Sequence, residues 1–496
     1  MNGHGKSDGP VLPAKPPNNP AAAGAEAVEG RGPAKGNTAS EARPGRSAGQ
    51  SVSQDLDRVR QAAARSKDER FTALLHHVTL DRLREAYRAI SPSAAPGVDG
   101  MTWRAYGQDL EDNLRGLHDR VQRGAFRAVP VRRVFIPKTD GRLRPFGVAS
   151  LEDKIVQRAL VEVLNSIYEQ DFLGFSYGFR PGRGQHDALD ALATGILRKK
   201  VNFVLDADIR DFFTRLDQRH LERFLEHRIG DARVLRLIQK WLRAGVMQNG
   251  EWSATEDGTA QGASISPLLS NVYLHYVFDL WAAQWRRHHA RGEMIIVRFA
   301  DDYVAGFQLR EDAERFLADL RDRFAQFSLE LHPDKTRLIE FGWNAARDRA
   351  RRGERRPETF DFLGFTHQCA KNRKGRFMLR RVTSKKKMQA KLHSVKTEMR
   401  RRRHDPIPEQ GRWLASVLDG HYRYYGVPGN QQNMAKFRFE VTKHWHSTLR
   451  RRSQRSRMTW ARMYRIALPW LPQAAIHHPW PQHRFDARTQ GRSPVR

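Results

Sequence analysis

Residues 294–307, which read MIIVRFADDYVAGF, constrain the fold most, because they place two adjacent carboxylates between two apolar segments. Residues 294–299 and 303–307 are rich in the β-branched and aromatic side chains that favour strands. The segment therefore predicts a β-hairpin with Asp301 and Asp302 at its tip. Asp is also an ordinary turn residue, so the pair taken alone is more typical of a solvated turn than of a functional site. A functional interpretation needs a partner carboxylate elsewhere in the chain.

The chain of 496 residues carries a formal net charge of +32. Such an imbalance predicts a polyanionic partner, nucleic acid first, whose binding weakens steeply with salt. A membrane surface is the competing polyanion, but no apolar run approaches the length that spans a bilayer, so we expect no membrane partner. The one cysteine, Cys369, excludes an internal disulfide and a Cys-x-x-Cys zinc site. Because the first residues contain no apolar secretory segment, we expect a cytoplasmic protein.

Composition divides the chain into four parts. Residues 1–54 are rich in Gly, Pro and Ala and contain no aromatic residue, which predicts a disordered tail. Over 55–370, helical periodicity such as that of 152–170 mixes irregularly with short strand patterns, which indicates an α+β fold with helices packed against a small antiparallel sheet. Residues 371–480 are basic and mostly helical in pattern, which predicts a separate helical domain. We expect 481–496 to be a flexible tail.

Residues 201–209, VNFVLDADI, supply the partner carboxylate that the hairpin needs. Their alternation predicts a strand with Asp206 and Asp208 on one face. Periodicity does not choose between the two, although Asp208 lies nearer the strand end. The alternative to a metal ligand is an Asp that caps the helix after the strand. A carboxylate here and the pair on a neighbouring hairpin would suit two Mg²⁺ ions, which prefer a few carboxylates together with water and phosphate. Two such ions, about 3.5–4 Å apart, are typical of in-line phosphoryl transfer.

Three segments, VLDADIRDFFTRLD, TAQGASISPLLSNVYL and RFADDYVAGF, occur in the order of the palm motifs of reverse transcriptases, which they resemble. Four more, PKTDGRLRPFGVASLEDKIVQRAL, FSYGFRPGRGQHDAL, LHPDKT and FDFLGF, narrow the resemblance to bacterial group II intron-encoded reverse transcriptase/maturases. The resemblance covers roughly residues 70–480. It implies a right-hand polymerase, with fingers and palm in 55–370 and an α-helical thumb/maturase domain in 371–480.

The resemblance implies a catalytic metal site formed by three carboxylates. Asp208 matches the first metal ligand of the family, and Asp301 with Asp302 match the metal-binding pair. Ile209 would add its backbone carbonyl, and two Mg²⁺ ions are the implied cofactor. The chain departs from most relatives at Phe299, where they have Tyr before Ala-Asp-Asp; the bulk remains and the hydroxyl is lost.

The resemblance also implies residues that contact the nucleotide and the primer. Lys138 and Arg144 would grip the triphosphate, and Phe213 would exclude a ribonucleotide's 2′-hydroxyl. Gln261 and Gly262 would line the turn beside the nucleotide, and Lys335 would protonate the departing pyrophosphate. Leu363 and Gly364 match the primer grip. Without the family match, Lys138 and Arg144 would be read as exposed hairpin charges, and Phe213 as a core residue. FSYGFRPGRG belongs to a family motif to which we assign no chemical role.

Runs of like charge in the C-terminal part are interleaved with aromatic residues, a combination that suits structured RNA. The alternative is a solvated helix face over an ordinary helical core. The candidate RNA-binding residues are Lys385, Lys386, Lys387, Arg400, Arg401, Arg402, Arg403, Arg450, Arg451 and Arg452.

We therefore expect an RNA-directed DNA polymerase encoded by a group II intron, in a bacterial cytoplasm and associated with the nucleoid. It would copy intron RNA into DNA from dNTPs on a primer strand of target DNA, and bind the intron RNA to assist splicing and mobility. One alternative is a domesticated reverse transcriptase of a defence or diversification system, and another is a splicing-only maturase with an idle polymerase site. We expect no His-Asn-His endonuclease domain, and the sequence leaves monomer or dimer open.

Overall fold

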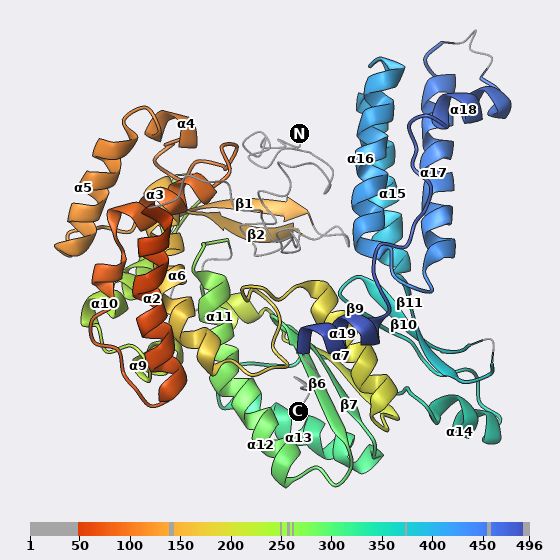
Figure 1. Cartoon of the computed structure of the whole chain (residues 1–496), viewed down its shortest axis with the longest axis horizontal. Coiled ribbons are helices and arrows are strands. Elements are labelled where there is room, and N and C mark those ends of the chain that lie inside the picture. The colour runs from red at the N-terminus through yellow and green to blue at the C-terminus, as the bar shows by residue number, and fades with distance from the viewer. Residues whose placement is uncertain are drawn as a thin grey trace.

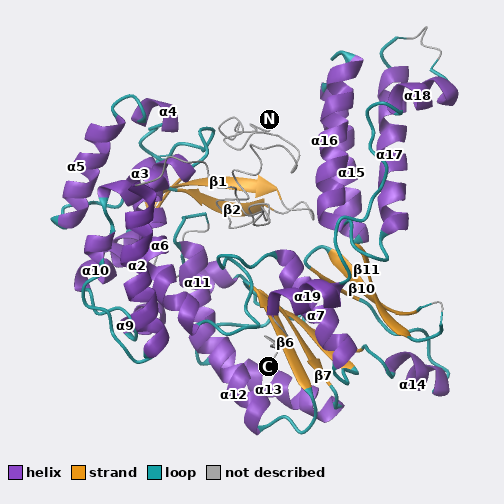
Figure 2. Cartoon of the chain, viewed as in Figure 1, coloured by secondary structure: helices purple, strands orange, loops and turns teal. Residues whose placement is uncertain are grey.

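A computed structural model describes residues 48–137, 143–248, 250–254, 258–259, 262–372, 374–453 and 458–489. These residues form an N-terminal lobe, a central sheet with its covering helices, and a C-terminal bundle of long helices (Figure 1). Helices predominate in the two outer parts, and the strands of the central sheet lie between them (Figure 2). The architecture is mixed α+β with small sheets, which confirms the predicted class.

The central sheet is antiparallel throughout and has the strand order β6-β7-β3-β8. Its strands are β3 (Phe203–Asp208), β6 (Met294–Phe299), β7 (Asp302–Phe307) and β8 (Arg337–Glu340). β6 and β7 pair from Met294↔Phe307 to Phe299↔Asp302, so the predicted hairpin forms with Ala300 and Asp301 as its turn.

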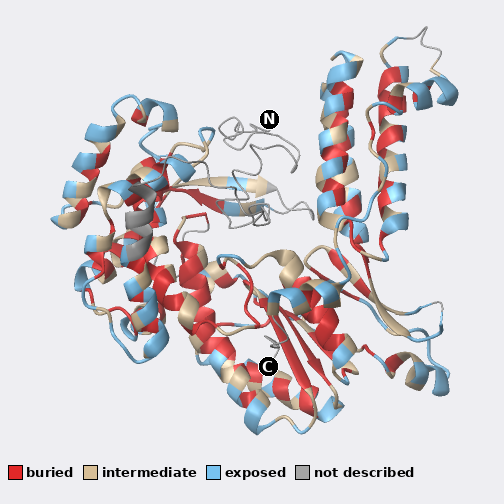
Figure 3. Cartoon of the chain, in the orientation of Figure 1, coloured by how far each residue is buried: buried red, intermediate tan, exposed pale blue. Residues whose placement is uncertain are grey.

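The alternation predicted for β3 puts its two faces into different hydrophobic clusters. Leu205 and Ala207 belong to the larger cluster, and Val204 belongs to a second cluster on the opposite face. The helices that contribute to the larger cluster beside this sheet are α11 (Ser266–Leu274), the π-helix η2 (His275–Asp279), α12 (Leu280–His288) and α13 (Arg310–Ala325). The second cluster includes α7 (Gln185–Arg198). Buried residues therefore follow both faces of this sheet (Figure 3).

The N-terminal lobe is a group of helices beside a second sheet of order β2-β1-β4-β5, in which β1 and β4 are parallel. Its strands are β1 (Val131–Pro137), β2 (Leu143–Val148), β4 (Val246–Gln248) and β5 (Glu251–Ser253). Its helical elements are α2 (Ala48–Arg65), η1 (Leu75–His77), α3 (Leu80–Ala89), α4 (Trp103–Tyr106), α5 (Leu110–Gln122), α6 (Leu151–Asp171), α8 (Phe212–Arg215), α9 (Gln218–Glu226) and α10 (Ala232–Arg243). The predicted helix over 152–170 is α6, whose first turn is capped by the Ser150 side chain.

The expected disordered tail over 1–54 is too long at its C-terminal end. Helix α2 begins at Ala48, inside that segment, while residues 1–47 lie outside the described part of the chain. The buried side chains of Leu56, Val59 and Ala63 join the larger cluster and anchor the helix. Once a helix is anchored, each further residue adds a hydrogen bond at low cost, so it extends upstream of its apolar positions.

The C-terminal part contains more strand than its basic composition indicates. A sheet of order β11-β10-β9 consists of β9 (Phe360–Phe362), β10 (Phe365–Lys371) and β11 (Phe377–Thr383), and it follows the short helix α14 (Ala345–Arg351). The bundle then comprises α15 (Lys385–Arg401), α16 (Ile407–Tyr425), α17 (Gln431–Arg450) and α18 (Trp460–Ala467). The boundary expected at residue 371 is therefore wrong, because β11 pairs with β10 through residue 383 before the helices begin.

The prediction of a flexible tail over 481–496 is wrong for its first nine residues, since α19 (Pro481–Thr489) packs on α7. Arg484 binds the buried Asp190 of α7 at 2.5 Å, and Asp190 also binds Arg381 of β11 at 2.8 Å. Phe485 is buried in the second cluster. The polar composition was misleading because the partners of these charges lie on a helix almost 300 residues earlier in the chain. Residues 490–496 lie outside the described part.

The free energy of unfolding should decrease as pH falls below about 6.5, because the bundle buries a histidine. His421 stacks on Phe437 with 3.8 Å between ring centroids, and burial, together with the charge of Lys391, lowers its pKa to about 3. The unfolded chain then binds the proton more tightly than the folded one, so stability present above pH 6.5 is lost toward pH 3. By pH 5 the loss from this group is about 2 kcal/mol.

His421→Phe should remove that part of the pH dependence, as measured by urea unfolding at pH 7 and pH 5. His393→Gln, an exposed position on α15, is the control and should keep the wild-type difference between the two pH values. An unchanged difference in His421→Phe would contradict the assignment.

Candidate active site

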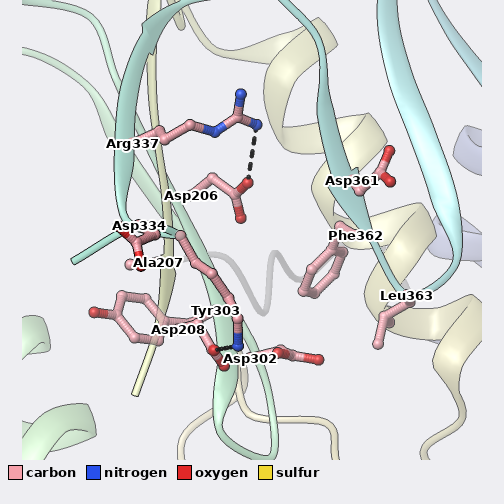
Figure 4. A pocket seen from close by; sticks show the side chains of 11 residues that line it. Asp206, Ala207, Asp208, Asp302, Tyr303, Asp334, Arg337, Asp361, Phe362 and Leu363 are labelled. Carbon is pink, nitrogen blue, oxygen red and sulfur yellow. Dashed lines mark hydrogen bonds and ion pairs between the residues drawn. The ribbon is translucent and has the colours of Figure 1, made fainter. Parts of the chain in front are cut away.

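A cavity of about 360 Å³ lies at the end of the central sheet, between β3, β7, β8 and the hairpin of β9 and β10. Figure 4 shows Asp206 and Asp208 on one side and Asp361, Phe362 and Leu363 facing them from the other. Its walls are formed by Asp206, Ala207, Asp208, Asp302, Tyr303, Asp334, Lys335, Arg337, Asp361, Phe362 and Leu363. Five of these eleven residues are aspartates, so the cavity is acidic although the chain is strongly basic.

The strand register brings two of the predicted ligands face to face. Asp208 is the last residue of β3, and its partner across the antiparallel pair is Asp302, the first residue of β7. Side chains of directly opposed residues project from the same face of a sheet and lie close together. Asp301 occupies the turn and is half-buried, but it is not among the residues that line the cavity. The structure thus pairs Asp208 with Asp302 and keeps Asp301 next to them in the chain.

Asp206 lies one step further into the sheet, opposite Val304. Its carboxylate is 3.5 Å from the Arg337 guanidinium, which extends from β8. Burial raises the pKa of Asp206 to about 6, the negative charges of Asp361 and Asp208 add to the rise, and Arg337 opposes it. Asp206 and Asp208 therefore differ in surroundings: the first is enclosed and bound by an arginine, and the second stands at the strand end opposite another carboxylate.

Like charges directly opposite each other destabilise a sheet unless a cation lies between them or nearby. Here the Lys335 ammonium forms an ion pair with the Asp208 carboxylate. Lys335 lies in the segment that precedes β8 and is half-exposed, so its side chain reaches the carboxylate from the open side of the cavity. The site therefore already holds a positive charge at Asp208.

This donor set fits Mg²⁺. Within the described ranges, no group of three or more His, Cys, Asp or Glu side chains converges closely enough to make a cage by itself. Mg²⁺ does not require such a cage, because it is commonly bound through one or two carboxylates and completes its shell with water and substrate phosphates. Asp208 and Asp302 would supply those carboxylates at an accessible edge, where Asp208 is already paired with the Lys335 ammonium.

Of the remaining candidates for the metal and the nucleotide, those that the structure describes do not line the cavity. Ile209 is buried and forms a β-bridge with Leu331, directly after Asp208. Phe213 is half-buried in α8, and its carbonyl accepts a hydrogen bond from the Thr259 backbone at 2.8 Å. Arg144 lies in β2 opposite Ile136. Lys138 and Gln261 lie outside the described residues.

Gly262 meets a structural requirement that the sequence did not reveal. Its φ is +114°, and a Cβ atom there would lie 2.5 Å from the Gly147 carbonyl oxygen and 2.6 Å from the Phe146 ring. The close approach that excludes a side chain is thus to strand β2 of the protein itself.

Leu363 and Gly364 form the turn between β9 and β10. Both have positive φ, +47° and +80°, as a two-residue hairpin turn requires at both central positions in its commonest form. The Leu363 carbonyl accepts a hydrogen bond from the Tyr424 hydroxyl at 2.8 Å, and the Gly364 carbonyl accepts one from the Ser384 backbone at 3.0 Å. The C-terminal bundle therefore holds this turn at the edge of the cavity.

The candidate RNA-binding residues are only partly available to a ligand. Lys385, Lys386 and Lys387 are exposed on the first turn of α15, and Arg400, Arg401, Arg450 and Arg451 are exposed at helix ends. Arg402 instead pairs with Glu398 and lies over the Trp413 ring. Arg452 donates to the Arg403 carbonyl at 2.7 Å, so it joins the ends of α15 and α17.

Sequence reasoning missed three charged residues of the cavity wall: Asp334, Arg337 and Asp361. Asp361 stands inside the quoted motif FDFLGF, and accepts hydrogen bonds from the hydroxyls of Thr366 and Ser384. Arg337 follows Lys335 by two residues, and the period of a strand would have placed both on one face. Asp334 gave no separate signal.

Comparisons with known proteins show the family of this chain. Residues 136–367 match the family model "Reverse transcriptase (RNA-dependent DNA polymerase)". Protein YkfC of Escherichia coli K12 is 33% identical over 337 residues, which cover 59% of this chain and 88% of that protein. The group II intron-encoded protein LtrA of Lactococcus lactis is 31% identical over 222 residues, 44% of this chain but only 37% of that protein.

The "Uncharacterized 91 kDa protein in cob intron" of Schizosaccharomyces pombe is 39% identical over 150 residues, 30% of this chain and 18% of that protein. No described helix is both long and apolar enough to cross a membrane.

The match to the family model, the coverage of YkfC and the intron-encoded relatives together show the family. This chain belongs to the family of group II intron-type reverse transcriptase/maturases.

Proposed function

We propose that this protein is an RNA-directed DNA polymerase of a group II intron, which extends a DNA primer on intron RNA and binds that RNA to assist splicing and mobility. The observation that carries the proposal is the pairing of Asp208 with Asp302 in an acidic cavity, within a chain of the reverse transcriptase family. Two opposed carboxylates at an accessible sheet edge suit nucleotidyl transfer with two Mg²⁺ ions.

In this proposal the N-terminal lobe acts as the fingers, the central sheet and its helices as the palm, and the C-terminal bundle as the thumb or maturase domain. The hairpin of β9 and β10 borders the cavity and is bonded to the bundle. A primer strand held by Leu363 and Gly364 would thus end at the carboxylates. The basic exposed ends of the bundle helices would hold RNA beyond it.

Asp208, Asp301 and Asp302, with the Ile209 carbonyl, would hold Mg²⁺, which when bound neutralises charge on the transferred phosphate and lowers the pKa of the primer hydroxyl. Lys335 is paired with Asp208 and can deliver a proton from Nζ to the departing pyrophosphate. The other proposed contacts to the dNTP, as the family pattern implies them, are made by Lys138, Arg144, Phe213, Gln261 and Gly262.

Removing the charge of either paired carboxylate should abolish polymerisation. Asp208→Asn and Asp302→Asn keep the side-chain size but remove the charge that a cation needs, so primer extension on an RNA template should fall by roughly a thousandfold or more, equivalent to several kcal/mol of transition-state stabilisation. Asp119→Asn, exposed on α5, is the matched control and should extend at the wild-type rate.

RNA binding measured on the same preparations should be unchanged in all three variants. Asn variants that polymerise normally would refute the site. A wild-type protein that binds and splices its intron but never extends a primer would favour the splicing-only alternative instead.

RNA affinity should decrease with salt, and the basic turn of α15 should contribute to that dependence. Lys386→Ala should weaken binding of structured RNA and reduce the slope of log Kobs against log salt by roughly 0.7–0.9 if it contacts one phosphate. Filter binding from about 50 to 200 mM salt, an interval over which several phosphate contacts change the affinity by orders of magnitude, measures the slope. Arg321→Ala, exposed on α13, should leave the slope unchanged, and equal effects of the two substitutions would argue against a defined RNA site on α15.

A further inference from the structure

The turn that carries Asp301 and Asp302 has an unfavourable backbone conformation. Ala300 has a φ of +56°, in the left-handed region that residues with a Cβ seldom occupy. Such a conformation persists when the surrounding structure determines it more strongly than the residue itself. The contacts of this turn therefore indicate what fixes the position of the carboxylates.

Arg298, two residues before Ala300, is fully buried and provides the main contact. Its guanidinium forms two bonds with the Asp279 carboxylate, at 2.7 and 2.5 Å. A third nitrogen atom, Nη1, donates to the Asn271 side-chain oxygen and to the Ala300 carbonyl, both at 3.0 Å. The rigid fork of an arginine thus ties the turn to the helix behind the sheet. Burying an arginine costs less free energy when its nitrogen atoms are hydrogen-bonded than when they are unpaired. Because one of these bonds goes to the Ala300 carbonyl, Arg298 also restrains the turn.

Asn271 and Asp279 face Arg298 together because the helix that carries them is not a regular α-helix. They lie eight residues apart, which in an α-helix separates two side chains by about 80° around the axis. Between α11 and α12 the backbone forms the π-helix η2, whose last residue is Asp279. A π turn uses more residues per turn than an α turn, and so brings Asp279 back toward the face of Asn271. Such turns often occur at functional sites.

The segment FSYGFRPGRG, to which the sequence analysis assigned no role, also contacts the turn. Asn271 donates from Nδ2 to the Gly178 carbonyl at 2.7 Å. A Cβ atom on Gly178 would lie 2.2 Å from the Ala300 nitrogen, so the two backbones touch. Arg180 fixes this loop by donating to the Ser176 carbonyl at 2.8 Å.

We propose that Asn271, Asp279 and Arg298, together with Gly178, are positioning residues that hold the Ala300–Asp301 turn so that Asp302, which follows it, stays opposite Asp208. The inference rests on the proposed function, and its distinguishing claim is that the network determines the geometry of the site in addition to the stability of the core. A displacement of about 1 Å at a reacting group can reduce a rate by about 100-fold.

The test uses Asn271→Ala, which keeps the Arg298–Asp279 ion pair, and Arg298→Lys, which keeps the charge but loses the fork. For each variant, kcat and KM for dNTP are measured by primer extension, the dissociation constant of Mn²⁺ alone by calorimetry, and the melting temperature by circular dichroism. We expect kcat to fall about 100-fold in each. KM should change less than threefold and Mn²⁺ binding should weaken severalfold, because distorted carboxylates bind both the ion and the transition state less well.

Arg228→Lys is the matched control. Arg228 is also buried, pairs with Asp171 at 3.0 Å, and donates to backbone carbonyls of the N-terminal lobe. It should lose melting temperature as Arg298→Lys does, while its kcat and Mn²⁺ affinity stay within twofold of wild type.

Variants that lose only melting temperature, with kcat and Mn²⁺ affinity like those of the control, would overturn the proposal. If Arg298→Lys does not fold, Asn271→Ala decides the question. If the wild type itself extends no primer, the proposed function fails separately, and the Mn²⁺ affinities of the same variants still decide whether the network positions the carboxylates.

Discussion

The register between β3 and β7 is the constraint on which the site depends. Because side chains alternate with a period of two, a slip of one residue would send every apolar side chain of β3 to the opposite face. Here Leu205 and Val204 enter two different hydrophobic clusters, so the register is fixed by burial on both faces of the sheet. Asp208 and Asp302 are opposed as a consequence of that packing, and the energy that holds the two carboxylates together comes from the apolar residues behind them.

The electrostatics of the molecule follow from this concentration of acid in a basic chain. The cavity contains five aspartates while the whole chain carries +32. Lys335 and Arg337 reach into it from the β8 side and pair with Asp208 and Asp206, which reduces the repulsion without filling the cavity. A surface that attracts a polyanion and a small acidic cavity that attracts a cation are together suited to phosphate chemistry on nucleic acid.

Prediction from the sequence succeeded where one local pattern was enough. The apolar segments around Ala-Asp-Asp predicted the hairpin, and the amphipathic period over 152–170 predicted α6. It failed where partners are distant in the chain: α19 had no visible apolar period, and its arginines bind a helix that precedes it by almost 300 residues. The sequence likewise did not show why residue 262 is a glycine, because the atoms that would collide with a Cβ there belong to β2.

The sequence by itself determined the residue types, the hairpin and the short list of acidic candidates, since strand and turn preferences act over a few neighbouring residues. The family resemblance linked these candidates to nucleotidyl transfer. Only the tertiary structure decided which carboxylate of β3 stands opposite Asp302, that Arg337 pairs with Asp206, and that Arg298 donates to the turn. These outcomes depend on strand register and on a buried network that includes the bond between Asn271 and Gly178, 93 residues apart in the sequence, and no local pattern encodes such contacts.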